Sequence, residues 1–83
     1  MNDGERKIRI GDKVMLRRGS EGGRVDIYRI VPPASADAEV GRISAESPLG
    51  AAMLGLAAGE TAEFEVAGIR KTVVVLRILP DAD

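Results

Sequence analysis

Two β-rich runs near the start of the chain are arranged as the strands of a hairpin. The first covers Lys13–Arg18 and the second Arg24–Val31, and three of the five residues between them are glycines. A loop of this kind predicts a β-hairpin rather than a phosphate-binding loop, which needs a helix after its glycines. Within the second run the apolar phase changes, since Val25 and Ile27 share one face while Tyr28 lies on the other. We expect a bulge at this point, or a strand that is partly covered on both faces.

The clearest helix start in the chain is Ser47 followed by Pro48. A serine N-cap accepts an unpaired amide proton, and proline fits the first helical position because its missing N–H would be unpaired there. Apolar residues then recur at helical spacing until Gly55, which is suited to end the helix. About two turns are too few to be stable alone, so we expect this helix to pack on a sheet. Gly50 inside it costs up to about 1 kcal/mol relative to alanine, which favours another backbone passing close by.

A second hairpin is predicted near the C-terminus. Residues Thr61–Val66 alternate between apolar and polar side chains, and Arg70–Leu79 is the longest strand candidate. The longer run carries apolar residues on both faces, which favours a central strand with the helix on one side. On this pattern Val73, Val75 and Leu79 point to the outer face, where either the chain itself or a second copy covers them.

Between the two hairpins, Pro32 and Pro33 end the second strand, and Arg42–Ser44 has the pattern of a very short strand. The order of elements predicts an α+β domain, with a twisted antiparallel β-sheet of four to five strands packed on one short α-helix. A chain of 83 residues holds one such domain, covering residues 1–83 with flexible ends at 1–11 and 80–83.

Composition excludes several kinds of chemistry. The chain has no cysteine and no histidine, which removes disulfides, thiolate nucleophiles and the commonest general base and metal ligand. Its serines therefore lack a histidine to activate them, and we expect neither an enzyme nor a cofactor. The aromatic residues are Tyr28 and Phe64, so the core must be aliphatic. Apolar runs such as 73–76 are far shorter than a signal sequence or a membrane span, which predicts a cytoplasmic protein without membrane contact.

Charge is distributed unevenly along the chain. The 12 basic and 13 acidic residues give a net charge of -1, which argues against a dedicated nucleic-acid-binding protein. Residues 32–69 carry six acidic side chains against one basic, so this segment either forms a solvated surface or faces a basic partner. The alternative function is a small β domain that binds nucleic acid through its basic first hairpin, at Arg17, Arg18, Arg24 and Arg29. Tyr28 alone is placed to stack on a base there.

The order of motifs along the chain resembles the C-terminal domain of the bacterial transcript-cleavage factors GreA and GreB. The motifs that carry this resemblance are Tyr28-Arg29-Ile30-Val31, Ala36-Asp37, Gly41-Arg42-Ile43-Ser44, Ser47-Pro48, Leu54-Gly55, Ala58-Gly59-Glu60 and the closing hairpin from Phe64 to Leu79. Residues 47–56 are most similar to the branch of this family formed by the regulator of nucleoside diphosphate kinase (Rnk). The resemblance implies an FKBP-like fold, in which a twisted antiparallel sheet wraps on a short helix.

The same resemblance implies a partner and a contact surface. Domains of this family dock on RNA polymerase, at the coiled coil of the β′ subunit beside the secondary channel, through an acidic-Ser-Pro corner. In this sequence the corner corresponds to Glu46, Ser47 and Pro48, with Asp37 and Leu49 as flanking candidates. The family usually has aspartate where this chain has Glu46, which predicts a longer or weaker contact.

The resemblance also bears on activity. Transcript cleavage in the family depends on an N-terminal coiled coil that carries acidic residues to a catalytic magnesium, and twelve residues precede the first predicted strand here. We therefore expect docking that regulates or competes without cleavage, by either a stand-alone domain or a C-terminal fragment of a longer factor. Ala51 and Leu56 replace basic residues common in the GreA/GreB helix and favour the Rnk branch. Prolyl isomerases share the general fold, but their pocket is lined by several aromatic side chains.

Overall fold

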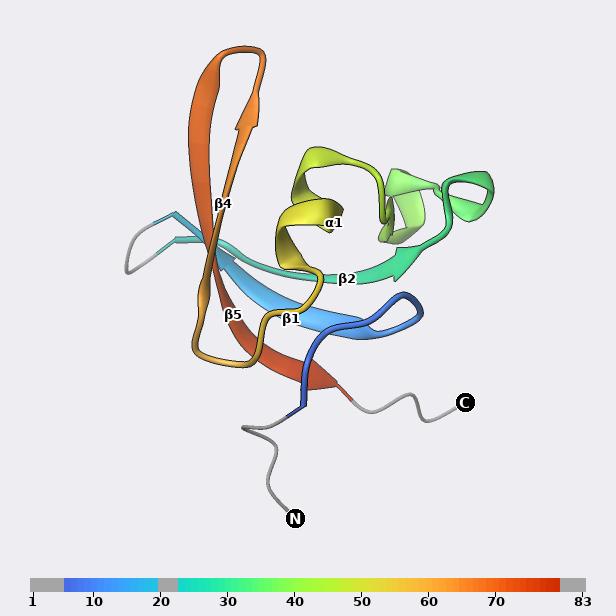
Figure 1. The fold of residues 1–83 in the computed structure, drawn as a ribbon, viewed down its shortest axis with the longest axis horizontal. Helices are drawn as coiled ribbons and strands as arrows, with labels where there is room; N and C mark the ends of the chain where they lie inside the picture. The colour runs from blue at the N-terminus through green and yellow to red at the C-terminus, as the bar shows by residue number, and fades with distance from the viewer. Residues whose placement is uncertain (1–5, 20–22, 80–83) are drawn as a thin grey trace.

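The computed structural model describes residues 6–19 and 23–79 of the chain. Five strands form one sheet in the order β3-β2-β1-β5-β4, and a short helix, α1, lies over one face of it (Figure 1). The elements are β1 Lys13–Arg18, β2 Val25–Val31, β3 Arg42–Ser44, α1 Pro48–Met53, β4 Thr61–Val66 and β5 Ile69–Leu79. The predicted α+β class, the two hairpins, the short strand and the single short helix are all confirmed.

The sheet is mixed, whereas the sequence pattern predicted a wholly antiparallel one. β3 runs parallel to β2, with Ile43 opposite Ile30, while the other three pairs are antiparallel. The reason lies in the connection between them, which contains two short 3-10 helices, Pro33–Ser35 and Ala38–Val40. This connection carries the chain back along β2, so that β3 starts beside Arg29 and runs in the same direction.

The bulge lies in β5 and not in β2, where the second of the two alternatives holds, since the adjacent residues Ile30 and Val31 are both buried. The pairing of β1 with β2 is regular along its whole length. Against β5, however, Met15 lies opposite Arg77 and Leu16 lies opposite Val75, which leaves Leu76 as an extra residue. A β-bulge of this kind shifts the alternation of the strand, so that residues beyond it face the opposite side from the one that strict alternation predicts.

The bulge decides which side chains of β5 reach the core. Val73 and Val75 are 1% and 0% exposed, and Ile78, three residues further along, packs against the same cluster. The prediction that Val73 and Val75 point outward was therefore wrong, because it assumed an unbroken alternation with the helix on the other side. Arg77 would share the core face with Val75 in a regular strand, and the bulge turns it to the outer face.

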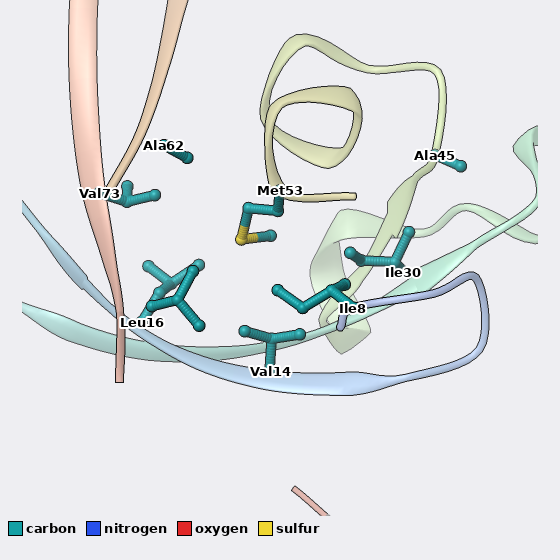
Figure 2. Close-up of a cluster of buried hydrophobic side chains, with 9 residues drawn as sticks. Ile8, Val14, Leu16, Ile30, Ala45, Met53, Ala62 and Val73 are labelled. Carbon is teal, nitrogen blue, oxygen red and sulfur yellow. The ribbon is translucent and has the colours of Figure 1, made fainter. Parts of the chain in front are cut away.

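The core is aliphatic, as the composition predicted, and lies between α1 and the sheet. Figure 2 shows Met53 directed from α1 toward Val14 and Leu16 of β1, and all three side chains are 0% exposed. The two aromatic residues are half-buried and pack against this cluster from its margin. The buried cluster consists of Ile8, Val14, Leu16, Ile30, Ala45, Met53, Ala62, Val73 and Val75.

The segment before β1 contributes to this core. We expected residues 1–11 to form a flexible end, but Ile8 is 2% exposed. Its N–H donates to the carbonyl oxygen of Leu56 at 2.9 Å, and its carbonyl oxygen accepts from the N–H of Gly55 at 2.9 Å. Ile8 is therefore tied to the end of the helix. Residues 1–5 and 80–83, the rest of the expected ends, lie outside the described residues.

The helix begins and ends as predicted. Ser47 is its N-cap, Pro48 occupies its first turn, and Gly55 beyond its end has a φ of 86°. Gly50 is buried, and a Cβ at that position would overlap the carbonyl oxygen of Ser44 and lie 3.2 Å from the Cα of Ala45. The predicted close approach of another backbone is thus confirmed, and that backbone is the segment leaving β3.

We predict that Gly50→Ala destabilises the domain by about 1–3 kcal/mol, the typical cost of forcing extra atoms into a packed site. The same substitution at an exposed helical position stabilises by up to about 1 kcal/mol, so the sign of the effect tests the contact. Urea unfolding measures it. Ala51→Gly, at the exposed neighbouring position, is the matched control and should cost no more than about 1 kcal/mol. A Gly50→Ala variant as stable as the wild type would contradict the close approach.

Candidate functional site

The turn between β3 and α1 contains the three residues that the sequence singled out, Glu46–Pro48, which we call the corner. The backbone of the corner is held by two serines. The carbonyl oxygen of Ser44 accepts both the N–H of Ser47 at 3.0 Å and its hydroxyl at 2.7 Å. The hydroxyl of Ser44 accepts the N–H of Glu46 at 2.9 Å, and that of Ser47 accepts the N–H of Gly50 at 3.1 Å.

These bonds divide the corner into supporting and accessible residues. Glu46 and Pro48 are exposed, whereas Ser47 is half-buried and its hydroxyl both donates and accepts within the turn. Leu49 is half-buried and packs against the core. The accessible side chains of the corner are therefore those of Glu46 and Pro48, while Ser47 and Leu49 fix their position. Sequence reasoning missed the supporting role of Ser44, although a serine hydroxyl commonly bonds the backbone two residues further on in a turn, as it does here.

Asp37, the other predicted flanking residue, lies away from the corner along β3. Its backbone N–H donates to the carbonyl oxygen of Arg42 at 2.9 Å, and its carbonyl oxygen accepts the N–H of Arg42 at 3.0 Å. The side chain is exposed and accepts the N–H of Glu39 at 3.2 Å, which caps the second 3-10 helix. Asp37 thus flanks the start of β3 and Glu46 follows its end, so β3 separates the two carboxylates.

The four arginines of the first hairpin do not form one patch. The register puts Arg17 and Arg29 on the outer face of the sheet and Arg18 on the face of the core. Arg18 and Arg24 both donate to the carboxylate of Asp26, from their Nε atoms at 2.7 Å and 3.1 Å. The alternative of nucleic-acid binding through a single surface of this hairpin loses its geometric basis.

The same arginines act on Asp26 electrostatically. The hydrogen bond from Arg18 lowers the pKa of the Asp26 carboxyl below its ordinary value of 3.8, and the hydrogen bond from Arg24 lowers it further. Arg18 also donates to the hydroxyl of Tyr28 at 2.7 Å. This cluster joins the two strands of the hairpin on the face that carries the core.

Pockets and clusters of acidic residues are the features that bear on the catalytic alternatives. A hollow of about 340 Å³ between the second hairpin and the end of β1 is lined by Phe64 together with Arg18, Gly19 and residues of β5, and Tyr28 is not among its lining residues. An aromatic-lined pocket of the isomerase kind is therefore not formed there. Within residues 6–19 and 23–79, no three His, Cys, Asp or Glu residues gather as a metal site needs.

No helix in this part of the chain is long and apolar enough to cross a membrane.

Comparison with known proteins identifies the family of this domain. The family model described as "Transcription elongation factor, GreA/GreB, C-term" matches residues 3–80, and the chain belongs to this family. GreA of Streptococcus pneumoniae is 36% identical over 72 residues, which cover 87% of this chain and 44% of that protein. GreA of Christiangramia forsetii is 35% identical over 60 residues, covering 72% and 37%. The chain thus spans less than half the length of these two relatives.

Solved structures agree with the assignment. The transcription factor Gfh1 superposes with a TM-score of 0.79 and 26% identity, over 96% of this chain and 53% of that one. GreA factor homolog 1 (Gfh1) of Thermus thermophilus gives a TM-score of 0.76 and 25% identity over the same shares. The curled five-stranded sheet with one short helix is the FKBP-like fold that the resemblance implied.

We predict that Ser47→Ala destabilises the domain by about 1 kcal/mol, because the N–H of Gly50 loses its acceptor. Ser47→Asp retains an acceptor at the N-cap and should recover most of that loss. Thermal unfolding compares the three proteins, and Ser35→Ala, at an exposed position in the β2–β3 connection, serves as the control. Equal stability of the wild type, Ser47→Ala and Ser47→Asp would contradict the role of the hydroxyl.

The lowered pKa of Asp26 predicts a dependence of stability on pH. Because the folded-state pKa lies below the unfolded value, the contribution of Asp26 is complete above about pH 5 and is lost as the pH falls through the lower folded value. Asp26→Asn should therefore flatten the fall in stability below about pH 4. Urea midpoints measured from pH 2 to 7 test this. Identical profiles for the wild type and Asp26→Asn, with Glu65→Gln as an exposed control, would refute it.

Proposed function

We propose that this domain binds RNA polymerase and acts as a non-catalytic docking module of the GreA/GreB family. The observation that supports it most directly is the corner itself. In a domain with the fold of this family, a turn fixed by four hydrogen bonds presents Glu46 and Pro48 to solvent at the position where the family has its acidic-Ser-Pro contact. Such a surface binds without first paying the entropy of ordering its own backbone.

The proposed partner surface is the coiled coil of the β′ subunit beside the secondary channel. The carboxylate of Glu46 suits a basic side chain there, and the ring of Pro48 offers a rigid apolar contact. The domain then acts by occupancy, since it covers the docking position of other secondary-channel factors. We further propose that the chain has no cleavage activity of its own, because the helix of its described part is the six-residue α1, which carries no acidic residue.

Two narrower assignments belong to the same proposal. Placement in the Rnk branch rests on residues 47–56 and stays a prediction, since the relatives reported above are GreA and Gfh1 proteins. A cytoplasmic location follows from binding to RNA polymerase, and the whole of residues 1–83 is proposed as one domain.

We predict that Glu46→Lys and Pro48→Ala each weaken binding to RNA polymerase by about tenfold or more, or about 1.4 kcal/mol. The first reverses the charge of the contact, and the second removes its rigid apolar part. Titration of purified polymerase with the labelled domain measures both, and unlabelled GreA should displace the wild type.

The matched control is Glu65→Lys, which makes the same change of charge at an exposed position of β4, the opposite edge of the sheet from β3. Circular dichroism confirms that each variant folds. Wild-type affinity in both corner variants would remove the corner from the proposal, and absence of saturable binding by the wild type would remove polymerase as the partner.

A further inference from the structure

The outer face of the sheet, on the side away from α1, carries five cations besides Arg70, which pairs with Glu63. Directly opposite residues of neighbouring strands share a face, so the register places Lys13, Arg29 and Arg42 in one row across β1, β2 and β3. Arg17 and Arg77 lie on the same face of β1 and β5. We call this surface the basic face, and it consists of Lys13, Arg17, Arg29, Arg42 and Arg77.

The row across β1, β2 and β3 sets like charges directly against each other. Lys13 lies opposite Arg29, which in turn lies opposite Arg42, and such pairs destabilise a sheet. Arg29 is engaged within the chain, since it donates to the carbonyl oxygen of Gly11 at 2.7 Å. The Nε of Arg17 is buried and finds no hydrogen-bond partner among the described residues. A bound anionic group would reduce the repulsion between cations such as Lys13 and Arg42 on this face.

Among the described residues, one carboxylate borders this surface: Asp37 lies opposite Arg42 at the edge of β3, and the two side chains form no ion pair. Within residues 6–19 and 23–79, Lys13, Arg42 and Arg77 form no ion pair. On the five strands themselves, the outward-facing carboxylates belong to Glu63 and Glu65, and both lie on β4 at the far edge. Glu63 is already paired with Arg70 at 3.1 Å.

Aliphatic side chains lie between the cations. Val25 and Ile27 of β2 are 51% and 48% exposed, and Val40 beside them is 63% exposed. A depression of about 290 Å³ is lined by Lys13, Ile27, Arg29, Val40, Gly41 and Arg42. Both aromatic residues belong to the opposite face, where Tyr28 pairs with Val14 and Phe64 with Lys71.

This combination distinguishes between two kinds of anionic partner. A nucleic acid offers phosphates to the cations, but it would leave the aliphatic side chains without apolar partners and finds no aromatic side chain to stack on. An acidic protein segment offers carboxylates, which suit guanidinium groups, and apolar side chains, which suit Ile27 and Val25.

We propose that the basic face is a second docking surface, which binds an acidic amphipathic segment of a partner protein. Carboxylates of that segment contact Lys13, Arg42 and Arg77, and its apolar side chains cover Ile27 and Val25. This surface does not depend on the corner, because α1 and Pro48 lie on the other face of the sheet, and the domain is able to hold two partners at once.

The test is titration of the full chain with three synthetic peptides of equal length, in the absence of polymerase. One is a helical peptide with glutamate on one face and leucine on the other, the second has glutamine in place of every glutamate, and the third is oligoglutamate. The glutamate–leucine peptide should bind at least about fivefold more tightly than the other two. Its affinity should fall severalfold when added salt screens the charges. Methyl NMR signals of Met15 and Ile27 should shift, while those of the buried Met53 and Ile30 should not.

Two substitutions separate the charge from the apolar contact. Arg42→Glu should weaken binding of the glutamate–leucine peptide by about tenfold, a typical cost for reversing one contacting charge. Ile27→Ser should weaken it severalfold, which a purely electrostatic attraction would not produce. Lys71→Glu, the same change of charge on the opposite face, should leave the affinity unchanged.

Four outcomes would overturn the proposal. The first is equal binding of the three peptides, and the second is binding that Lys71→Glu weakens as much as Arg42→Glu does. The third is tighter binding of single-stranded RNA than of the glutamate–leucine peptide, which would assign the face to nucleic acid. The fourth is binding that appears after Asp81→Asn and Asp83→Asn but not before, which would assign the face to the chain's own acidic end. Because polymerase takes no part, none of these results bears on the corner.

Discussion

The β-bulge at Leu76 is the constraint on which both sides of this sheet depend. β5 pairs with two neighbours and is the longest strand, so one inserted residue changes what it presents to each side. Val75 before the bulge and Ile78 after it both enter the core, although strict alternation would separate them. Arg77 is turned outward by the same shift. The continuous core under α1 and the continuous basic face behind it therefore both result from the bulge at Leu76.

The corner depends on a different constraint, the contact between the backbones of α1 and the segment leaving β3. Gly50 allows that contact because it has no Cβ, and the carbonyl oxygen of Ser44 sits where a Cβ would be. The same carbonyl oxygen accepts two hydrogen bonds from Ser47. The carbonyl group of Ser44 thus sets both the position of the helix and the shape of the turn before it. The exposed side chains of the corner are held in a defined position as a result.

Local signals in the sequence were sufficient to predict features that depend on one residue and its near neighbours, such as the start of α1. The N-cap at Ser47, the proline after it and the glycine at 50 each have a single physical explanation, and the structure has all three features. Non-local features were missed. The parallel pairing of β3 depends on how the β2–β3 connection crosses the sheet edge, and the bulge depends on two strands far apart in the chain. The burial of Ile8 depends on its hydrogen bonds to Gly55 and Leu56. The sequence pattern near residue 8 does not predict these bonds. The local structure of the corner was therefore predictable from the sequence, whereas the basic face needed the register.

The two edges of the sheet limit how other chains are able to associate with it. At one edge β3 is three residues long, and its free side is occupied by the backbone of Asp37, which pairs with Arg42. At the other edge β4 carries glutamate at alternate positions, 63 and 65, and charged side chains on an edge strand oppose the addition of a further strand. Growth of the sheet by a partner strand, the usual route to edge-to-edge aggregation, is thus disfavoured on both sides. Association through the faces or the corner would instead depend on side chains and not on backbone hydrogen bonds.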